Sequence, residues 1–287
     1  MVIMESIHIG VSRASPGTCC NGDDTGSSEN DAQSLAQLAT TLGFISRTVL
    51  VAPGDATRTR LIGEFDRVVQ KFALNGQEGG LLLLTFAGHG CRKKVSSPPA
   101  PLKGKADTWC LHDGQFHDYE LLAQLARFRS TDRIVILSDS CHSGGLVSVF
   151  NLPALLQHAW ASLLKLAVAP LEMPLPPGSP GAWAFDSARW RRLKAQAEQL
   201  PSITAHVLLL SSSEENQSSS QTEHDGVFTA AILAQAPTGF LSYLSWFEAV
   251  KREVHKKPDH QSPGWIPLDG CSAFWNQTPF NPAPVTC

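Results

Sequence analysis

The sequence lacks long hydrophobic runs and an excess of either charge. None of its apolar stretches approaches the roughly 18 residues that a membrane-spanning helix needs, and residues 1–6 show no basic segment followed by an apolar stretch and a cleavage site. The 287 residues carry 23 basic and 26 acidic side chains, for a formal net charge of -3. We therefore expect a cytoplasmic protein with neither a membrane nor a nucleic acid as its partner.

The cysteines lack the spacing of a disulfide framework or of a zinc site. The chain has seven of them, an odd number without regular intervals. Neither Cys19–Cys20 nor the stretch from Cys110 to His117 shows the paired ligand spacing of structural zinc sites. A Gly-rich phosphate loop and a Gly-x-Ser-x-Gly turn are absent as well. We expect thiols without disulfides, a reducing compartment, and no metal or other cofactor.

The elements that the sequence does show alternate between apolar runs and helical spacings. Strand patterns alternating with helical patterns are typical of a parallel sheet with covering helices. The sequence thus predicts an α/β fold, with a mainly parallel sheet of about six strands and helices on both faces. The expected strands are 6–12, 44–51, 81–86, 133–138 and 205–210; the expected helices are 28–42, 56–74, 118–129, 225–236 and 240–255, with a hairpin around 113–114.

The order breaks down in the middle of the chain. Residues 150–203 contain an apolar helical stretch, a cluster of prolines and a basic segment, which together indicate an insertion or connector. We therefore expect one domain over residues 1–270, interrupted by this insertion, and a tail at 271–287.

Two apolar runs end in small, polar turns that each carry a reactive side chain. The run at 81–86 leads to His89, which has glycine on both sides, and the run at 134–137 leads to Cys141, just before Gly144–Gly145. If both runs are neighbouring parallel strands, their carboxyl ends place His89 and Cys141 side by side, where α/β proteins bind ligands. The pair predicts a cysteine–histidine nucleophilic site.

Other interpretations of these residues compete with this one. Cys141 could be a small buried cysteine at a strand end, and His89 a structural histidine. His142 is a second imidazole, but it follows Cys141 directly and is expected to point to the opposite side. A hydrolase using Ser140 or Ser143 would keep its activity after thiol alkylation.

The sequence resembles metacaspases and other caspase-like peptidases. The segments Phe86–Gly90 and Asp139–Gly144 look like the catalytic histidine and cysteine blocks of that family, and their separation of about 50 residues is typical of caspases. The resemblance covers roughly residues 5–265, without the insertion. Three further segments match in order, namely Glu29–Ala32, Asp107–Gly114 and Asp225–Ala230.

The resemblance implies the chemistry and the fold. It implies a caspase-like three-layer sandwich in which Cys141 is the nucleophile and His89 delivers a proton to the leaving amine. The backbone amides of Gly90 and Cys141 would stabilise the oxyanion. Some metacaspases need calcium bound by aspartates, one of them seven residues beyond the nucleophile; that position is Ser148 here, which argues against a calcium requirement.

The resemblance also implies a specificity site for basic side chains. The positions that match its acidic residues are Asp31 and Asp139, which would bind arginine or lysine and repel aspartate. A serine of the family's site is replaced by Ala87. Asp31 has a local alternative, because Ser28–Asp31 also reads as the amino-terminal cap of a helix with an acid in its first turn.

We therefore expect a cysteine endopeptidase that cuts protein or peptide substrates after arginine or lysine. The alternative is a catalytically weak caspase-like module that acts in signalling or assembly. The basic segment Arg189–Lys194 lies where the family often has a linker, which motivates a self-processing hypothesis. The same segment could be a solvated amphipathic helix.

Overall fold

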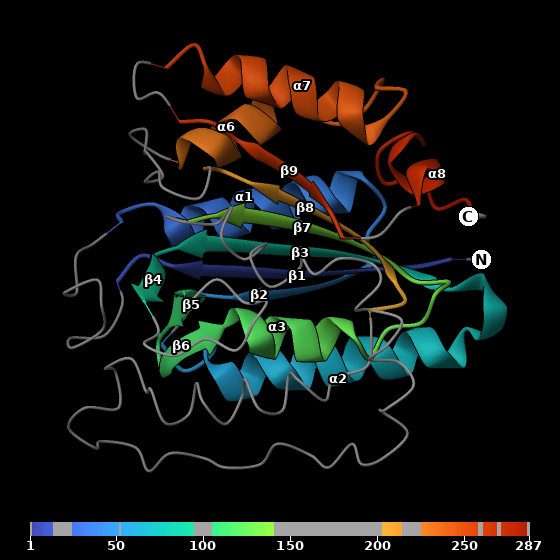
Figure 1. Ribbon diagram of the computed structural model, residues 1–287, viewed down its shortest axis with the longest axis horizontal. Coiled ribbons are helices and arrows are strands. Elements are labelled where there is room, and N and C mark those ends of the chain that lie inside the picture. The colour runs from blue at the N-terminus through green and yellow to red at the C-terminus, as the bar shows by residue number, and fades with distance from the viewer. Residues whose placement is uncertain are drawn as a thin grey trace.

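A six-stranded sheet forms the centre of the molecule (Figure 1). The computed structural model describes residues 2–13, 25–51, 53–94, 105–140, 203–213, 225–257, 261–268 and 271–285. The strand order is β2-β1-β3-β7-β8-β9, and every neighbouring pair is parallel except β8 with β9. The predicted mainly parallel sheet is thus confirmed. The strands are β1 Ile3–Val11, β2 Ser46–Leu50, β3 Gly80–Gly88, β7 Arg133–Asp139, β8 His206–Ser211 and β9 Gly264–Pro267.

Helices cover both faces of this sheet, which confirms the expected three-layer α/β sandwich (Figure 1). Side chains of β3 alternate between the two layers: Leu82 and Leu84 belong to a first hydrophobic cluster with α2 and α3, whereas Leu81 and Leu83 belong to a second one with α1, α6 and α7. These helices are α1 Ser28–Thr41, α2 Arg58–Leu74, α3 Asp118–Leu125, α6 Val227–Ala234 and α7 Tyr243–Val254.

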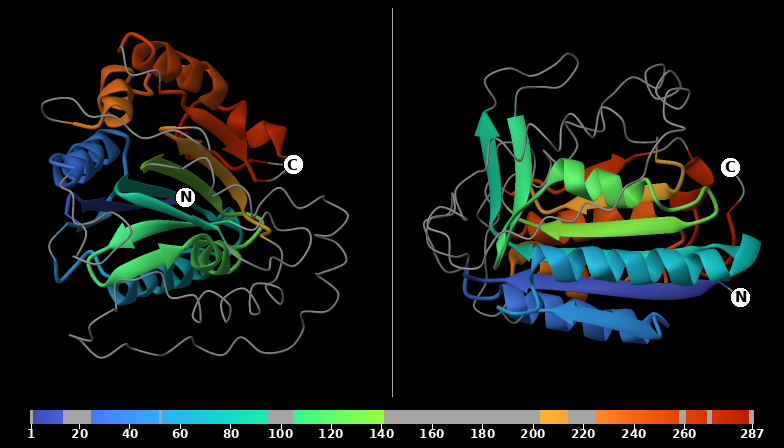
Figure 2. Two further views of the ribbon diagram at one scale, coloured as in Figure 1. Left: turned by 60° about the vertical axis from the view of Figure 1, so that its left-hand side comes forward. Right: turned by 90° about the horizontal axis from the view of Figure 1, so that it is seen from below.

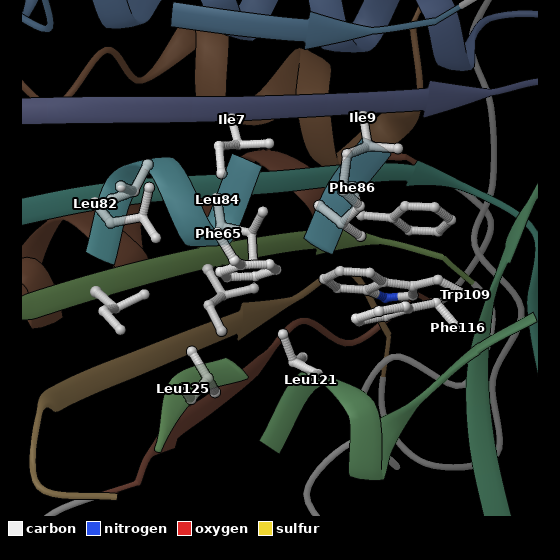
Figure 3. Close-up of a cluster of buried hydrophobic side chains, with 14 of the residues drawn as sticks. Ile7, Ile9, Phe65, Leu82, Leu84, Phe86, Trp109, Phe116, Leu121 and Leu125 are labelled. Atoms are coloured by element: carbon white, nitrogen blue, oxygen red, sulfur yellow. The ribbon is translucent and has the colours of Figure 1, made fainter. Parts of the chain in front are cut away.

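The two central strands explain why the sequence indicates a parallel sheet. All nine residues of β3 and all seven of β7 are buried, as expected for strands covered on both faces. Figure 3 shows how the first cluster fills the space between β3 and the helices beneath it, with Phe65 of α2 and Leu121 and Leu125 of α3 packed toward the sheet. The apolar runs in the sequence are therefore core strands.

A second, three-stranded sheet stands at the carboxyl ends of the parallel strands (Figures 1 and 2). It consists of β4 Gly90–Lys94, β5 Lys105–Leu111 and β6 Gly114–His117, all antiparallel. The β5–β6 turn confirms the hairpin predicted around residues 113–114. Four further elements are not predicted from the sequence, because such short segments show no clear periodicity: β4, β9, the short helix Gly76–Glu78 and α8 Ser272–Trp275.

Residues 271–285, which the sequence sets apart as a tail, pack against the second cluster. Phe274 and Phe280 are buried there. The buried guanidinium of Arg133, at the start of β7, donates hydrogen bonds to the carbonyl oxygens of Asn281 (2.9 Å) and Pro282 (3.1 Å). The predicted insertion at 150–203 lies outside the described residues except for its last residue.

Candidate active site

The ends of β3 and β7 lie side by side. Their parallel register runs from Leu81–Arg133 to Ala87–Asp139. His89 follows Ala87 by two residues and Cys141 follows Asp139 by two, so the register leads toward both predicted catalytic positions. This confirms that the two runs are neighbouring parallel strands. Cys141 itself lies outside the described residues.

His89 occupies the junction between the main sheet and the small one. It is half-buried and lies between β3 and β4, and its carbonyl oxygen accepts a hydrogen bond from the backbone N–H of Cys110 (3.0 Å). Gly88 has a φ of 151°, and a Cβ there would approach the carbonyl oxygen of Val11 to 2.8 Å. Glycine therefore allows the sharp exit from β3 that brings His89 to the sheet edge.

An aromatic stack lies beneath this edge, as Figure 3 shows. The indole of Trp109 stacks on Phe86, with ring centroids 4.7 Å apart and planes 9° apart, and Phe116 lies on its other side at 6.3 Å. Its Nε1–H donates to the hydroxyl of Ser138 at 3.2 Å, which lies 3.2 Å from the hydroxyl of Ser140. Trp109 thus links β5 to residues 138–140, which directly precede position 141.

Buried serines hold the carbonyl group of Ser140, the residue before the predicted nucleophile. The hydroxyls of Ser212 and Ser213, just after β8, donate to it at 3.4 and 3.3 Å. Gln261 in turn donates from its side-chain amide to the carbonyl of Ser212 at 2.7 Å. All four side chains are buried, so these hydrogen bonds are shielded from water.

Asp31 and Asp139, here called the acidic pair, meet at the amino terminus of α6. Asp31 is 2% exposed and its Oδ1 accepts from the backbone N–H of Gly226 (2.9 Å). Asp139 is 7% exposed and its Oδ2 accepts from both the backbone N–H and the hydroxyl of Thr229, each at 3.2 Å. The fold therefore brings together two acids that are remote in the sequence.

The environment of Asp31 disfavours its charged form. Burial, together with the charges of Asp139 and Asp225, raises its pKa to about 8, although the hydrogen bond from Gly226 opposes the rise. Asp31 is therefore protonated at neutral pH. A cation placed against the pair would reverse this balance, because it favours the carboxylate.

A family model, described as the caspase domain (Peptidase_C14), matches residues 21–269. The chain belongs to this family. Its structure is similar to that of protein GSU0716 from Geobacter sulfurreducens, with 25% identity and a TM-score of 0.68 over 97% of this chain and 98% of that one. It is also similar to caspase-1 from Spodoptera frugiperda, with 13% identity and a TM-score of 0.51 over 93% and 89%, a likeness that shows the fold. No curated protein matches the chain.

The caspase domain places Asp31, His89, Gly90 and Asp139 at one edge of the sheet. The alternative interpretation of Ser28–Asp31 is confirmed in part, because α1 begins at Ser28 and Asp31 lies in its first turn. The amino-terminal cap is Ser27, which makes no side-chain capping hydrogen bond, and the Asp31 carboxylate accepts its hydrogen bond from Gly226, next to α6. The remaining predicted positions lie outside the described residues, namely Cys141, His142, Ser143, Ser148 and Arg189–Lys194.

The cysteines correct one expectation. Cys91 and Cys271 are each disulfide-bonded, so the prediction of thiols without disulfides is wrong for these two. Cys110 is buried and outside any disulfide. Among the residues that the structure describes, no group of three or more His, Cys, Asp or Glu side chains could hold a metal ion, and no helix is long and apolar enough to cross a bilayer.

The residues that hydrogen-bond to the acidic pair and to the Ser140 carbonyl are not predicted from the sequence. Gly226 and Thr229 lie in the segment Asp225–Ala230, which matches the family, but their contacts with the acidic pair depend on the packing of α6. Ser212 and Ser213 stand in a polar loop after a strand. No pattern in the sequence connects them with Ser140, because Ser140 follows β7 and the two serines follow β8, more than 70 residues later.

Proposed function

We propose that this caspase domain is a cysteine endopeptidase that cleaves after arginine or lysine. Cys141 is the nucleophile, His89 the acid and base, and the acidic pair of Asp31 and Asp139 receives the basic side chain. The observation that supports this most is that Asp31 and Asp139 meet at the carboxyl end of β7, beside the end of β3 that leads to His89. This edge is where parallel α/β sheets bind their ligands.

The proposed reaction has two steps. The Cys141 thiolate attacks the carbonyl carbon and forms a C–S bond, while the amides of Gly90 and Cys141 donate to the oxyanion. The C–N bond then breaks as the His89 imidazolium gives its proton to the leaving amine. In the second step, water loses a proton to His89 and attacks the thioester, and the thiolate leaves.

The acidic pair supports the preference for basic residues. A guanidinium or ammonium group forms charge-assisted hydrogen bonds with carboxylates, whereas an aspartate would be repelled and left unsatisfied. The two acids are 2% and 7% exposed, so water screens their attraction for a bound cation only weakly.

Fluorogenic peptides that differ only in the residue before the cut test the proposal. We expect release after arginine and lysine, none after aspartate, and none from Cys141→Ala with any peptide. Chelation by EDTA should leave the wild-type rate unchanged. Absence of release from the wild type would instead support a caspase-like signalling or assembly module, and activity in Cys141→Ala would point to a serine nucleophile.

Self-processing belongs to the same proposal. The basic segment Arg189–Lys194 offers the preferred residues, so the purified wild type should break into two fragments there, and Cys141→Ala should stay intact. Identical fragments from both proteins on a gel would show that another protease makes the cut.

A further inference from the structure

The chain from Asp225 to Thr229 contacts both members of the acidic pair. Gly226 donates its backbone N–H to Asp31, and Thr229 donates its backbone N–H and hydroxyl to Asp139. All these donors come from the first turn of α6 and the residue before it. One short segment therefore orients two acids that come from α1 and from the end of β7.

Helix α6 has no side-chain cap of its own. Its amino-terminal cap is Gly226, which has no side chain to accept the free N–H groups of the first turn. The Asp139 carboxylate takes this role from β7 by accepting the N–H of Thr229. The partial positive charge of the helix terminus favours the carboxylate in that position.

Glycine is required at position 226 because a side chain there would collide with the acidic pair, and not because of its backbone angles. Its φ of -58° and ψ of 146° suit any residue, but a Cβ there would lie 2.3 Å from Oδ2 of Asp139 and 3.3 Å from Oδ2 of Asp31. A contact of 2.3 Å forces something to move. Either the Asp139 carboxylate turns away or α6 shifts off the acidic pair.

The core holds this segment in place. Val227 and Phe228 of α6 are buried in the second hydrophobic cluster, 2% and 1% exposed, and Ala231 and Ile232 follow them one turn later. Because this side of α6 is anchored, its first turn cannot adjust freely to a changed side chain. The orientation of the two carboxylates is thus fixed before a ligand arrives.

We propose that Gly226 and Thr229 determine specificity by positioning the acidic pair for a basic substrate side chain. Gly226 sets how closely the two carboxylates approach each other, and Thr229 sets the direction of Asp139. This assignment rests on the proposed function. It adds α6 to the elements that build the specificity site, alongside α1 and β7.

The experiment compares two peptides that end in arginine or in citrulline, its neutral isostere, before the cut. For Gly226→Ala we expect the kcat/KM ratio of arginine to citrulline to fall roughly 10- to 100-fold, mainly through KM for arginine, since a misplaced charge-assisted contact costs about that much. Thr229→Val should lower the ratio roughly three- to tenfold, whereas Thr229→Ser, which keeps the hydroxyl, should stay within about twofold of the wild type.

Ala234→Gly is the matched control, because it weakens the exposed end of the same helix without touching the acids. Its ratio should equal that of the wild type. An unchanged ratio in Gly226→Ala and Thr229→Val, or an equal fall in Ala234→Gly, would overturn the assignment while leaving the proposed function standing. If Gly226→Ala does not fold, the Thr229 variants decide alone. A wild type that cuts neither peptide would overturn the proposed function and this assignment with it.

Discussion

Asp31 and Asp139 are held by donors only three residues apart, Gly226 and Thr229, at the start of α6. Burial and the nearby charge of Asp139 raise the pKa of Asp31 to about 8. The pair therefore holds a proton at neutral pH that a bound cation would displace. Several measurable consequences come from this arrangement and from the contacts around it.

The preference for arginine over citrulline should increase with pH. Below pH 8 Asp31 is neutral, and above it the carboxylate is charged and attracts the guanidinium more strongly. We expect the ratio of kcat/KM for the two peptides to rise roughly tenfold between pH 6 and pH 9. Any effect of pH on the chemical step is common to both peptides and cancels in the ratio. A ratio that stays flat over this range would contradict the prediction.

Asp31→Asn should stabilise the protein at alkaline pH. Because the pKa of Asp31 is higher in the folded protein than in the unfolded chain, its contribution to stability is complete below about pH 4 and is lost as pH rises to about 8. Asparagine keeps the acceptor for Gly226 without titrating. The gain in unfolding free energy should therefore grow from pH 4 to 8, reach on the order of a few kcal/mol, and then level off. Urea unfolding of the variant and the wild type at pH 4, 6 and 9 measures this gain. An equal difference in unfolding free energy at all three pH values would contradict the raised pKa of Asp31.

Trp109→Phe should destabilise the fold through the aromatic stack. The change removes the hydrogen bond from Nε1 to Ser138 and part of the contact with Phe86. We expect a loss of about 1–3 kcal/mol in urea unfolding. Trp265→Phe, at a half-buried position of β9, is the control and should lose less. Equal losses in the two variants would count against the role of the stack.

Replacing Ser212 and Ser213 together by alanine should slow catalysis more than it weakens substrate binding. The double variant removes both hydroxyl donors to the Ser140 carbonyl, which precedes the proposed nucleophile. We expect kcat to fall roughly tenfold, with KM for the arginine peptide nearly unchanged. The lost hydrogen bonds orient the nucleophile and do not bind the substrate. A rise in KM at constant kcat would place these serines in substrate binding instead.

Arg133→Met should loosen the C-terminal residues without changing specificity. Its guanidinium holds the carbonyls of Asn281 and Pro282 at the end of β7 that is remote from Asp139. We expect a loss of about 2–4 kcal/mol in unfolding free energy and faster proteolysis near residue 280. The ratio of arginine to citrulline cleavage should match that of the wild type. Unaltered proteolysis would show that the hydrogen bonds from Arg133 contribute little to holding the C-terminal residues in place.

Local patterns in the sequence were sufficient for the framework of the fold. The apolar runs leading to Ala87 and Asp139 are typical of buried strands, and the alternation of strands with helices predicts a parallel sheet that contains both; the structure makes them neighbours in it. From that pairing, His89 and position 141 follow directly. The family motifs identified Asp31 and Asp139, although no spacing along the chain relates these two residues to each other.

Tertiary packing decided which hydrogen bonds orient the site residues and whether Asp31 is protonated. The approach of Gly226 to the acidic pair, the raised pKa of Asp31 and the serines around the Ser140 carbonyl all depend on contacts between segments remote in the chain. Periodicity and propensity report only on neighbours within a few residues. Desolvation and charge repulsion arise where separate elements meet, so they are set when α1, β7 and α6 pack together and not before.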